Sequence, residues 1–296
     1  MAVTETIQAM SRSDDDHLLT PELRESVRRV AATIEDSGPL GVAYSGGVDS
    51  AVLLALAVRT LGPDRVVAIL GVSPSLAADE RAAAHEVARF IGARVIEVET
   101  FEGQNAAYRA NGPDRCFHCK DELFNRISDD VVEAHRLTAV AYGENADDAR
   151  RPDRPGAQAA TNHRVLRPLA EAGLTKKAVR EIARALALPC ADKPAAPCLA
   201  SRIPHHQEVT PEKLRQVEQA ESGLRSLGFA DSRVRHHGEI ARLELMPADL
   251  ARAVEPQVRD AIHEVVIRAG FRFAALDLAG IQSGAFTLAL LEVQRG

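Results

Sequence analysis

The sequence predicts an α/β protein in which a doubly wound parallel sheet is followed by a smaller C-terminal α+β domain. Two observations predict the sheet: short apolar strands alternate with amphipathic helices, and a glycine turn joins the first strand directly to a helix. This alternation is typical of parallel sheets covered on both faces, which bind ligands at the carboxyl ends of their strands. A third observation predicts the second domain: the pattern changes beyond a Pro- and Ala-rich stretch at residues 191–207.

The predicted elements follow the chain in a regular order. Strands of the parallel sheet are expected at 40–44, 66–71, 94–98 and 137–142, with helices at 21–35, through 51–56, at 77–91 and at 120–135. The C-terminal domain is expected to hold a helix at 211–227, strands at 232–236 and 240–245, a helix at 247–269 and a strand at 272–278. The pattern divides the chain into a flexible tail (1–20), a large α/β domain (21–204) and a C-terminal domain (205–296).

Composition narrows the classes of function. Hydrophobic residues make up 46% of the chain, and no apolar run reaches the roughly 18–20 residues of a membrane span. The N-terminal stretch is polar and contains Asp14, Asp15 and Asp16, unlike a secretory signal, so we expect a cytoplasmic protein with no membrane partner. A formal net charge of −6 disfavours the binding of long nucleic acid.

The glycine turn after the first strand, Ser-Gly-Gly-Val-Asp-Ser, has the chemistry of a phosphate-binding loop. Gly46 and Gly47 let the backbone turn tightly and bring N–H groups toward phosphate oxygens, next to the positive end of a helix. Ser45 and Ser50 can donate hydroxyl hydrogen bonds, and Asp49 can hold Mg²⁺. The turn lacks the lysine of the G-x-x-x-x-G-K-[ST] loop, but strand, turn and helix coincide as nucleotide binding requires.

Three of the four cysteines lie where chemistry is expected. Cys116 and Cys119 form a C-x-x-C motif, which suits redox, zinc or iron–sulfur sites. Cys198 lies in the Pro- and Ala-rich stretch, near Arg202 and a lysine, and nearby cations favour the thiolate. Cys190, at the end of a helix, is expected to be a packed core cysteine. A zinc site or unligated thiols remain alternatives to an iron–sulfur site.

Residues 45–50 resemble the PP-loop of the ATP pyrophosphatases, which implies cleavage between the α- and β-phosphates of ATP. The rest of the chain resembles one branch of that superfamily, the LarE-type sulfur transferases that build a nickel-pincer cofactor. The matching segments are 115–120, 154–156, 197–204, 233–236 and 276–280. The resemblance implies Mg²⁺-dependent adenylation of a carboxylate on pyridinium-3,5-biscarboxylic acid mononucleotide, release of pyrophosphate and AMP, and insertion of sulfur. It also implies that residues 21–204 form the ATP pyrophosphatase domain and 205–296 a domain for substrate binding or oligomerisation, in a homo-oligomer.

The LarE-type family has two sulfur sources. In one, a cysteine at the position of Cys198 gives up its own sulfur and becomes dehydroalanine. In the other, that cysteine and a C-x-x-C pair hold a [4Fe-4S] cluster. Because Cys116 and Cys119 are present, we expect the cluster, whose fourth iron would be open to carry a sulfide. Without the cluster, Cys198 would be the sacrificial nucleophile.

Five charged residues complete the predicted site. Lys120 and Arg202 are candidates to neutralise the triphosphate or the departing pyrophosphate. Arg233 and Arg235 fall on one face of a strand and suit a substrate phosphate or carboxylate. Glu221 matches a functional acidic position of the family.

Other polar residues remain open. The segment 142–148 ends a strand, where a pocket wall is expected, and could help to position Mg²⁺ or the nucleotide, although its Asp147 and Asp148 could equally be ordinary loop charges. The histidines show no metal-binding spacing and have no assigned role.

Two other functions fit parts of the sequence. A tRNA thiolase of the PP-loop superfamily would also use cysteines, but would need a basic surface. A nucleotide-binding regulator without chemistry would have no need for the three cysteines and the paired arginines.

Overall fold

The computed structural model describes residues 19–150, 155–194 and 196–281. The predicted tail lies almost entirely outside these residues, as does Arg154 of one matching segment. The chain divides into two compact units. Pro74–Ala77 and Gly103–Arg115 belong to the smaller unit although they precede its main part, which starts at Pro197. The boundary predicted at residue 204, with its assignment of roles, stays a prediction.

The larger unit contains a four-stranded parallel sheet, which confirms the predicted fold class. Its order is β3-β2-β1-β4. The strands are β1 (Leu40–Ala43), β2 (Val66–Val72), β3 (Arg94–Glu99) and β4 (Ala139–Tyr142). All three pairings are parallel, with Leu40 opposite both Val66 and Ala139. The first strand in the sequence is therefore internal to the sheet, and its carboxyl end is flanked by those of β2 and β4.

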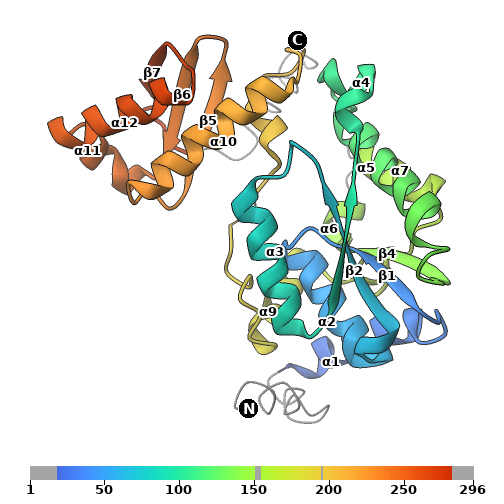
Figure 1. The fold of residues 1–296 in the computed structure, drawn as a ribbon. Helices are drawn as coiled ribbons and strands as arrows, with labels where there is room; N and C mark the ends of the chain where they lie inside the picture. Colours follow the sequence, from blue (N-terminus) through green and yellow to red (C-terminus); the bar gives the residue numbers. More distant parts are fainter. Residues whose placement is uncertain (1–18, 151–154, 195, 282–296) are drawn as a thin grey trace, which may run out of the picture. The chain divides into compact units, whose positions relative to one another are not determined.

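Helices cover both faces of this sheet, as its apolar strands require. The longer helices are α1 (Pro21–Ile34), α2 (Val48–Leu61), α3 (Ala78–Ile91), α5 (Arg115–Arg126) and α9 (Lys176–Ala185). Shorter helices are α6 (Ala146–Ala149), α7 (Pro155–Asn162) and α8 (Pro168–Glu171). Figure 1 shows α2, α3 and α9 on one face, with α5 and α7 on the other. The core under α5 and α7 includes Ile69, Phe124 and Ala160.

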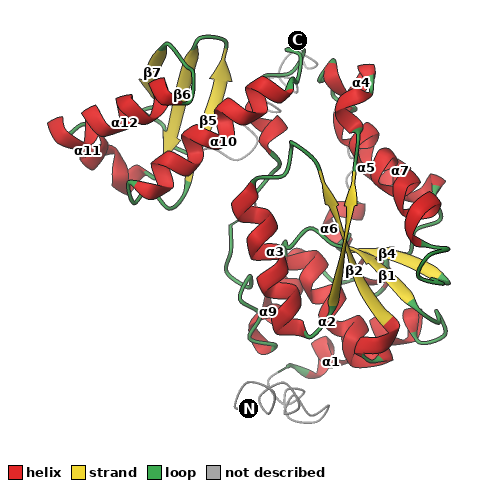
Figure 2. Cartoon of the chain, viewed as in Figure 1, coloured by secondary structure: helices red, strands yellow, loops and turns green. Residues whose placement is uncertain are grey.

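The smaller unit is an α+β structure, as predicted (Figure 2). Its sheet has the order β5-β6-β7: β5 (Ser232–His237) is antiparallel to β6 (Ile240–Leu245), and β7 (Phe273–Leu276) is parallel to β6. The helices α10 (Pro211–Ser226), α11 (Leu250–Ala253) and α12 (Pro256–Arg268) accompany it. Alternating side chains of the strands, such as Val234 and Leu243, pack with Leu224 and Val266 from the helices. The opposite face of β5 carries the two arginines of the predicted site.

Two predicted helices differ from the structure. The helix expected to begin at residue 120 begins at Arg115 and continues into a π-helix at Ile127–Val131. The single helix predicted for 247–269 is interrupted, because Pro256 has no N–H to donate and instead begins a new helix at its first position. None of the helices in the described ranges is long and apolar enough to cross a bilayer.

Packing in the smaller unit also leads to a testable pH dependence. His236 is buried against Phe271 and shares a 3.0 Å hydrogen bond between its Nε2 and Oε1 of Gln216. Burial, and then the charge of Lys213, lower the pKa of His236 from 6.5 to about 4. Between these values the unfolded chain binds a proton that folded His236 does not, so stability should fall as pH drops from about 6.5 to about 4.

His236→Gln should therefore show a shallower loss of stability over this pH range than the parent protein. Urea unfolding at pH 7, 6, 5 and 4 checks it. Identical slopes for the two proteins would contradict the argument.

Candidate active site

The predicted phosphate loop lies at the carboxyl end of β1 and leads directly into α2. Gly47 is the N-cap of α2. The hydroxyl of Ser50 donates to the carbonyl of Gly47 at 3.0 Å and accepts from the backbone N–H of Ser45 at 3.2 Å. The hydroxyls of Ser45 and Ser50 are 3.3 Å apart. These bonds hold the turn together at the N-terminus of α2. The backbone N–H groups of a helix N-terminus are suited to bind phosphate oxygens.

Two glycines are required by the packing of this loop. Gly46 has φ +74°, and a Cβ there would lie 2.7 Å from the Cβ and 2.9 Å from the Cα of Ala84 in α3. A Cβ on Gly143, just beyond β4, would lie 2.7 Å from the backbone nitrogen of Ser50. The loop is thus held between α3 and the end of β4 at distances that only glycine permits.

Gly46→Ala should reduce ATP affinity at least about tenfold and lower stability by about 1–3 kcal/mol, because it adds a clash to a left-handed backbone. Gly62→Ala is the matched control: Gly62 follows α2, has φ +88°, and has open space around its Cβ position. The control should lose stability but keep ATP affinity. ATP titrations and urea unfolding measure both, and equal ATP affinity in the two variants would contradict the role of the close packing.

Asp49 lies in the first turn of α2 and is oriented from the next strand of the sheet. The side-chain amide of Asn145, beyond β4, donates to Oδ1 of Asp49 at 3.1 Å and to Oδ2 of Asp148 at 3.1 Å. Burial raises the pKa of Asp49; the Asn145 bond opposes this, and the charge of Asp148 adds to the rise. Carboxylate oxygens gathered in this way are the ligands that Mg²⁺ prefers, so the residues fit the predicted metal.

The carboxyl edge of β4 also contacts the predicted phosphate ligand Lys120. The Lys120 ammonium lies 4.6 Å from the centre of the Tyr142 ring. Its aliphatic chain lies beside Gly156, where a Cβ would be 2.8 Å from Cδ of Lys120. The structure therefore brings Lys120 to the end of the strand that packs on the phosphate loop.

Asp147 and Asp148, whose role the sequence left open, make different contacts. Asp147 accepts a 2.8 Å hydrogen bond from the backbone N–H of Lys176, at the start of α9. Asp148 accepts from Asn145 and, through it, is linked to Asp49. Asp147 thus ties two helix termini together, whereas Asp148 is the one connected to the predicted magnesium ligand.

The C-x-x-C motif opens α5 rather than preceding it. Cys116 is exposed and Cys119 is half-buried, and neither is in a disulfide. Three residues apart on one helix, they lie on neighbouring positions of its surface. Cys190 is buried, as predicted, and burial raises the pKa of its thiol.

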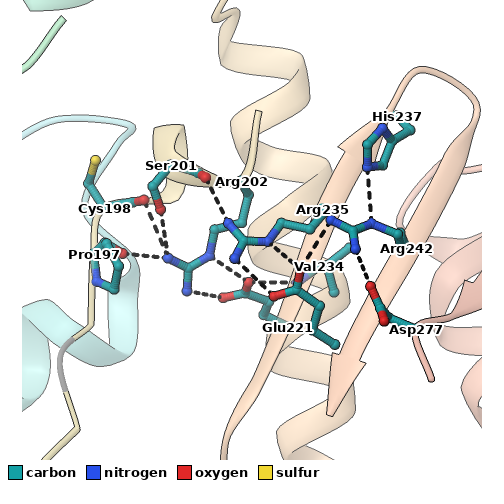
Figure 3. A network of polar contacts seen from close by, with 11 residues as sticks. Pro197, Cys198, Ser201, Arg202, Glu221, Val234, Arg235, His237, Arg242 and Asp277 are labelled. Atoms are coloured by element: carbon teal, nitrogen blue, oxygen red, sulfur yellow. Dashed lines mark hydrogen bonds and ion pairs between the residues drawn. The ribbon is translucent and has the colours of Figure 1, made fainter. Parts of the chain in front are cut away.

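Cys198 is exposed and belongs to a turn, residues 197–204, whose carbonyl groups are bound by arginines (Figure 3). Arg202 donates to the carbonyl of Pro197 at 2.7 Å, and Arg235 to that of Ser201 at 3.0 Å. A third, Arg115, donates to the carbonyl of Ala200 at 2.9 Å. Figure 3 shows the sulfur of Cys198 pointing away from the Arg202 guanidinium group. We call residues 197–204 the cysteine turn.

The predicted acidic residue Glu221 belongs to this arrangement. Its carboxylate accepts two bonds from Arg202, at 2.8 and 3.2 Å, and one from the backbone N–H of Val234 at 2.9 Å. Arg202 and Glu221 are both buried. The pair joins the cysteine turn to α10 and β5. The roles predicted for these residues, a triphosphate ligand for Arg202 and a catalytic residue for Glu221, stay predictions.

The predicted substrate arginines lie together on β5, on the face turned away from the helices. Arg235 binds Glu244 through two 2.9 Å bonds, and Glu244 in turn pairs with Arg242 at 3.1 Å. Arg242 also pairs with Asp277 and donates to Nε2 of His237 at 3.2 Å. Arg233 is buried, and burial, with the charges of Arg202 and Arg235, lowers its pKa. Clustered guanidinium groups of this kind favour an anion.

Sequence reasoning missed several residues that hold the site. Glu244 was not predicted, neither were the contacts of Arg115, and Asn145 was predicted only as one member of the segment 142–148. For Asn145 a signal existed: a polar side chain directly follows β4, at the sheet edge where ligands bind.

The described residues contain no group of three or more His, Cys, Asp or Glu side chains placed to hold a metal ion. The [4Fe-4S] cluster at Cys116, Cys119 and Cys198 therefore stays a prediction.

Residues 19–128, which include the phosphate loop and the C-x-x-C motif, match the asparagine synthase family. The chain is 42% identical over 243 residues to an uncharacterized protein of Synechocystis sp., covering 82% of this chain and 90% of that protein. It is 31% identical over 265 residues to the pyridinium-3,5-bisthiocarboxylic acid mononucleotide synthase of Lactiplantibacillus plantarum, covering 90% of this chain and 95% of that enzyme. An uncharacterized protein of Methanocaldococcus jannaschii is 28% identical over 204 residues, 69% of this chain and 76% of that protein.

Proposed function

Since this chain belongs to the LarE-type branch of the PP-loop ATP pyrophosphatases, we propose that it thiolates a pyridinium carboxylate at the expense of ATP. The substrate would be pyridinium-3,5-biscarboxylic acid mononucleotide and the product its thiocarboxylate. The observation that carries this proposal is the exposed Cys198, held on a turn whose carbonyl groups are bound by buried arginines. A PP-loop enzyme that only joins an amine to an acid has no use for such a sulfur.

In the first step, a carboxylate oxygen of the substrate attacks the α-phosphorus of ATP, and pyrophosphate leaves. The loop N–H groups and the N-terminus of α2 would hold the departing phosphates, and Lys120 would neutralise them. Asp49, oriented by Asn145, would hold Mg²⁺, which supplies positive charge to the phosphate oxygens. The product is an acyl adenylate, in which AMP is a far better leaving group than hydroxide.

In the second step, a sulfur nucleophile attacks the acyl carbon and AMP leaves. Arg233 and Arg235 would hold an anionic group of the substrate. The positive charges of Arg202 and Arg235 beside Arg233 favour an anion at this place. If the Cys198 thiolate itself attacks, a thioester forms. Loss of the Cys198 α-proton to a base and cleavage of its Cβ–S bond then leave the thiocarboxylate and dehydroalanine.

The other sulfur source is the one that the C-x-x-C motif favours. Cys116, Cys119 and Cys198 form no disulfides, and cysteine sulfurs are the donors that a [4Fe-4S] cluster takes. Such a cluster would supply the sulfur that the second step needs. What supports these ligands is the absence of a disulfide at each cysteine and the exposure of Cys116 and Cys198.

The test is a reaction of anaerobically purified protein with ATP, Mg²⁺ and the pyridinium dicarboxylate, followed by mass spectrometry. We expect one oxygen of the substrate to be exchanged for sulfur, with release of AMP and pyrophosphate. Iron and sulfide analysis and the mass of the peptide containing Cys198 then separate the two sulfur sources. Unchanged pyridinium in this reaction, with thiolation of tRNA in a parallel one, would overturn the proposal.

A further inference from the structure

Asn111 is a buried polar residue that binds the end of the cysteine turn. It is fully buried, and its side-chain amide donates to three carbonyl groups: Ile203 at 3.2 Å, Pro204 at 2.8 Å and Gln207 at 3.1 Å. The backbone carbonyl of Asn111 accepts from the N–H of His206 at 3.1 Å. One side chain therefore fixes the last part of the cysteine turn and the residues that follow it.

Arg115 holds the first part of the same turn. Its Nη1 donates to the side-chain oxygen of Asn111 at 2.6 Å and to the carbonyl of Ala200 at 2.9 Å. The guanidinium group is buried, so these charge-assisted bonds are strong and costly to break. Asn111 and Arg115 thus form one hydrogen-bonded unit, which we call the clamp.

The backbone at Asn111 adopts a conformation that glycine tolerates more easily than asparagine. Asn111 has φ 55°, the left-handed region that favours glycine. Glycine would adopt this conformation with less strain but could not bind any of the three carbonyl groups. Asparagine at this position therefore provides the side-chain amide at the expense of some backbone strain.

The clamp also lies at a particular place in the chain. Arg115 is the residue before Cys116, so one peptide bond connects the C-x-x-C motif to a side chain that binds Ala200, two residues after Cys198.

We propose that Asn111 and Arg115 are positioning residues for sulfur transfer: they hold the turn that bears Cys198 in the conformation that presents its sulfur. This inference rests on the proposed function. The hydrogen bonds of the clamp run to the carbonyl groups of Ala200, Ile203, Pro204 and Gln207, so we expect its loss to act on the turn that bears Cys198. Loosening it should uncouple the two steps, leaving adenylation intact and slowing the delivery of sulfur.

The experiment compares Asn111→Gly and Arg115→Lys with the full-length parent. Asn111→Gly keeps the backbone conformation and removes only the amide, whereas Arg115→Lys keeps the charge and removes the forked donors. Arg109→Lys is the control, because Arg109 lies on the same segment, in the short helix Ala106–Arg109, and binds the carbonyl groups of Gly103 and Gln104 instead. Adenylation is measured as substrate-dependent exchange of labelled pyrophosphate into ATP, and sulfur transfer as thiocarboxylate formed.

Both clamp variants should keep pyrophosphate exchange within about twofold of the parent, while thiocarboxylate formation falls about tenfold to a hundredfold, the range expected when a reacting group is misplaced. Hydrogen exchange at the amides of Leu199 and Ser201 should accelerate in both variants and not in the control. Parental thiocarboxylate formation in both variants would overturn the proposal. So would an equal loss of both steps, which would indicate a general structural role.

A parent that forms no thiocarboxylate at all would count against the proposed function and not against the clamp. Hydrogen exchange then decides: faster exchange confined to the cysteine turn supports the clamp, and unchanged exchange overturns it.

Discussion

Cys198→Ser should form no detectable thiocarboxylate, a loss of at least about a hundredfold, while substrate-dependent pyrophosphate exchange continues at the parental rate. The reason is that a serine hydroxyl neither ionises near neutral pH nor carries a sulfur to give, and both proposed sulfur sources need the Cys198 thiolate. Its side chain is exposed on a turn fixed by backbone contacts, so the substitution leaves the fold intact. Mass spectrometry of the product and the exchange assay give the two rates.

The control for loss of a thiol is Cys190→Ala. Cys190 is buried, so this variant should lose some stability and retain sulfur transfer. Thiocarboxylate formation by Cys198→Ser at the parental rate would exclude Cys198 as a donor or a ligand.

Asp49→Ala should lower the rate of pyrophosphate release by about 10²–10³-fold, because the phosphates lose the Mg²⁺ that this carboxylate would hold. The same variant should unfold no more easily than the parent. Burial raises the pKa of Asp49, which means that the folded protein disfavours the ionised carboxylate and loses nothing in stability when it is removed. Pyrophosphate release and urea unfolding measure these two effects.

Asp64→Ala is the matched control, an exposed aspartate in the turn after α2. It should match the parent in both measurements. Asp49→Ala turning over as fast as Asp64→Ala would remove Asp49 from the mechanism.

The sequence predicted the parallel sheet well, because buried strands such as 66–71 are continuous apolar runs between clear turn residues. Its four strands lie within two residues of their predicted ends. The start of α5 was harder, since Cys116, Phe117 and His118 are poor helix formers and gave no signal for a first turn. Pro256 did give a signal for the break before α12, but the surrounding apolar period concealed it.

Part of the candidate site could be predicted from the sequence, and part could not. The phosphate loop could be predicted because strand, glycine turn and helix are adjacent in sequence. Asn111, Arg115 and Glu244 could not, because their bonds join segments far apart along the chain, such as Arg115 with Ala200. A charged residue looks the same in sequence whether it binds a ligand or holds a turn, which is why Arg202 was predicted as a phosphate ligand and its contact with Glu221 was not.

The oligomeric state, the exclusion of nucleic acid and the cytoplasmic location stay predictions from the sequence. The similarity to the synthase of Lactiplantibacillus plantarum supports a small-molecule substrate, and the same reaction with tRNA as the acceptor tests the alternative.

The most direct measurement is the fate of ATP in the presence of the pyridinium dicarboxylate. If residues 45–50 hold the nucleotide for attack at its inner phosphorus, ATP is converted to AMP and pyrophosphate only when that acid is present. Release of ADP and phosphate instead, or consumption of ATP that ignores the acid, would show that this loop performs a different reaction.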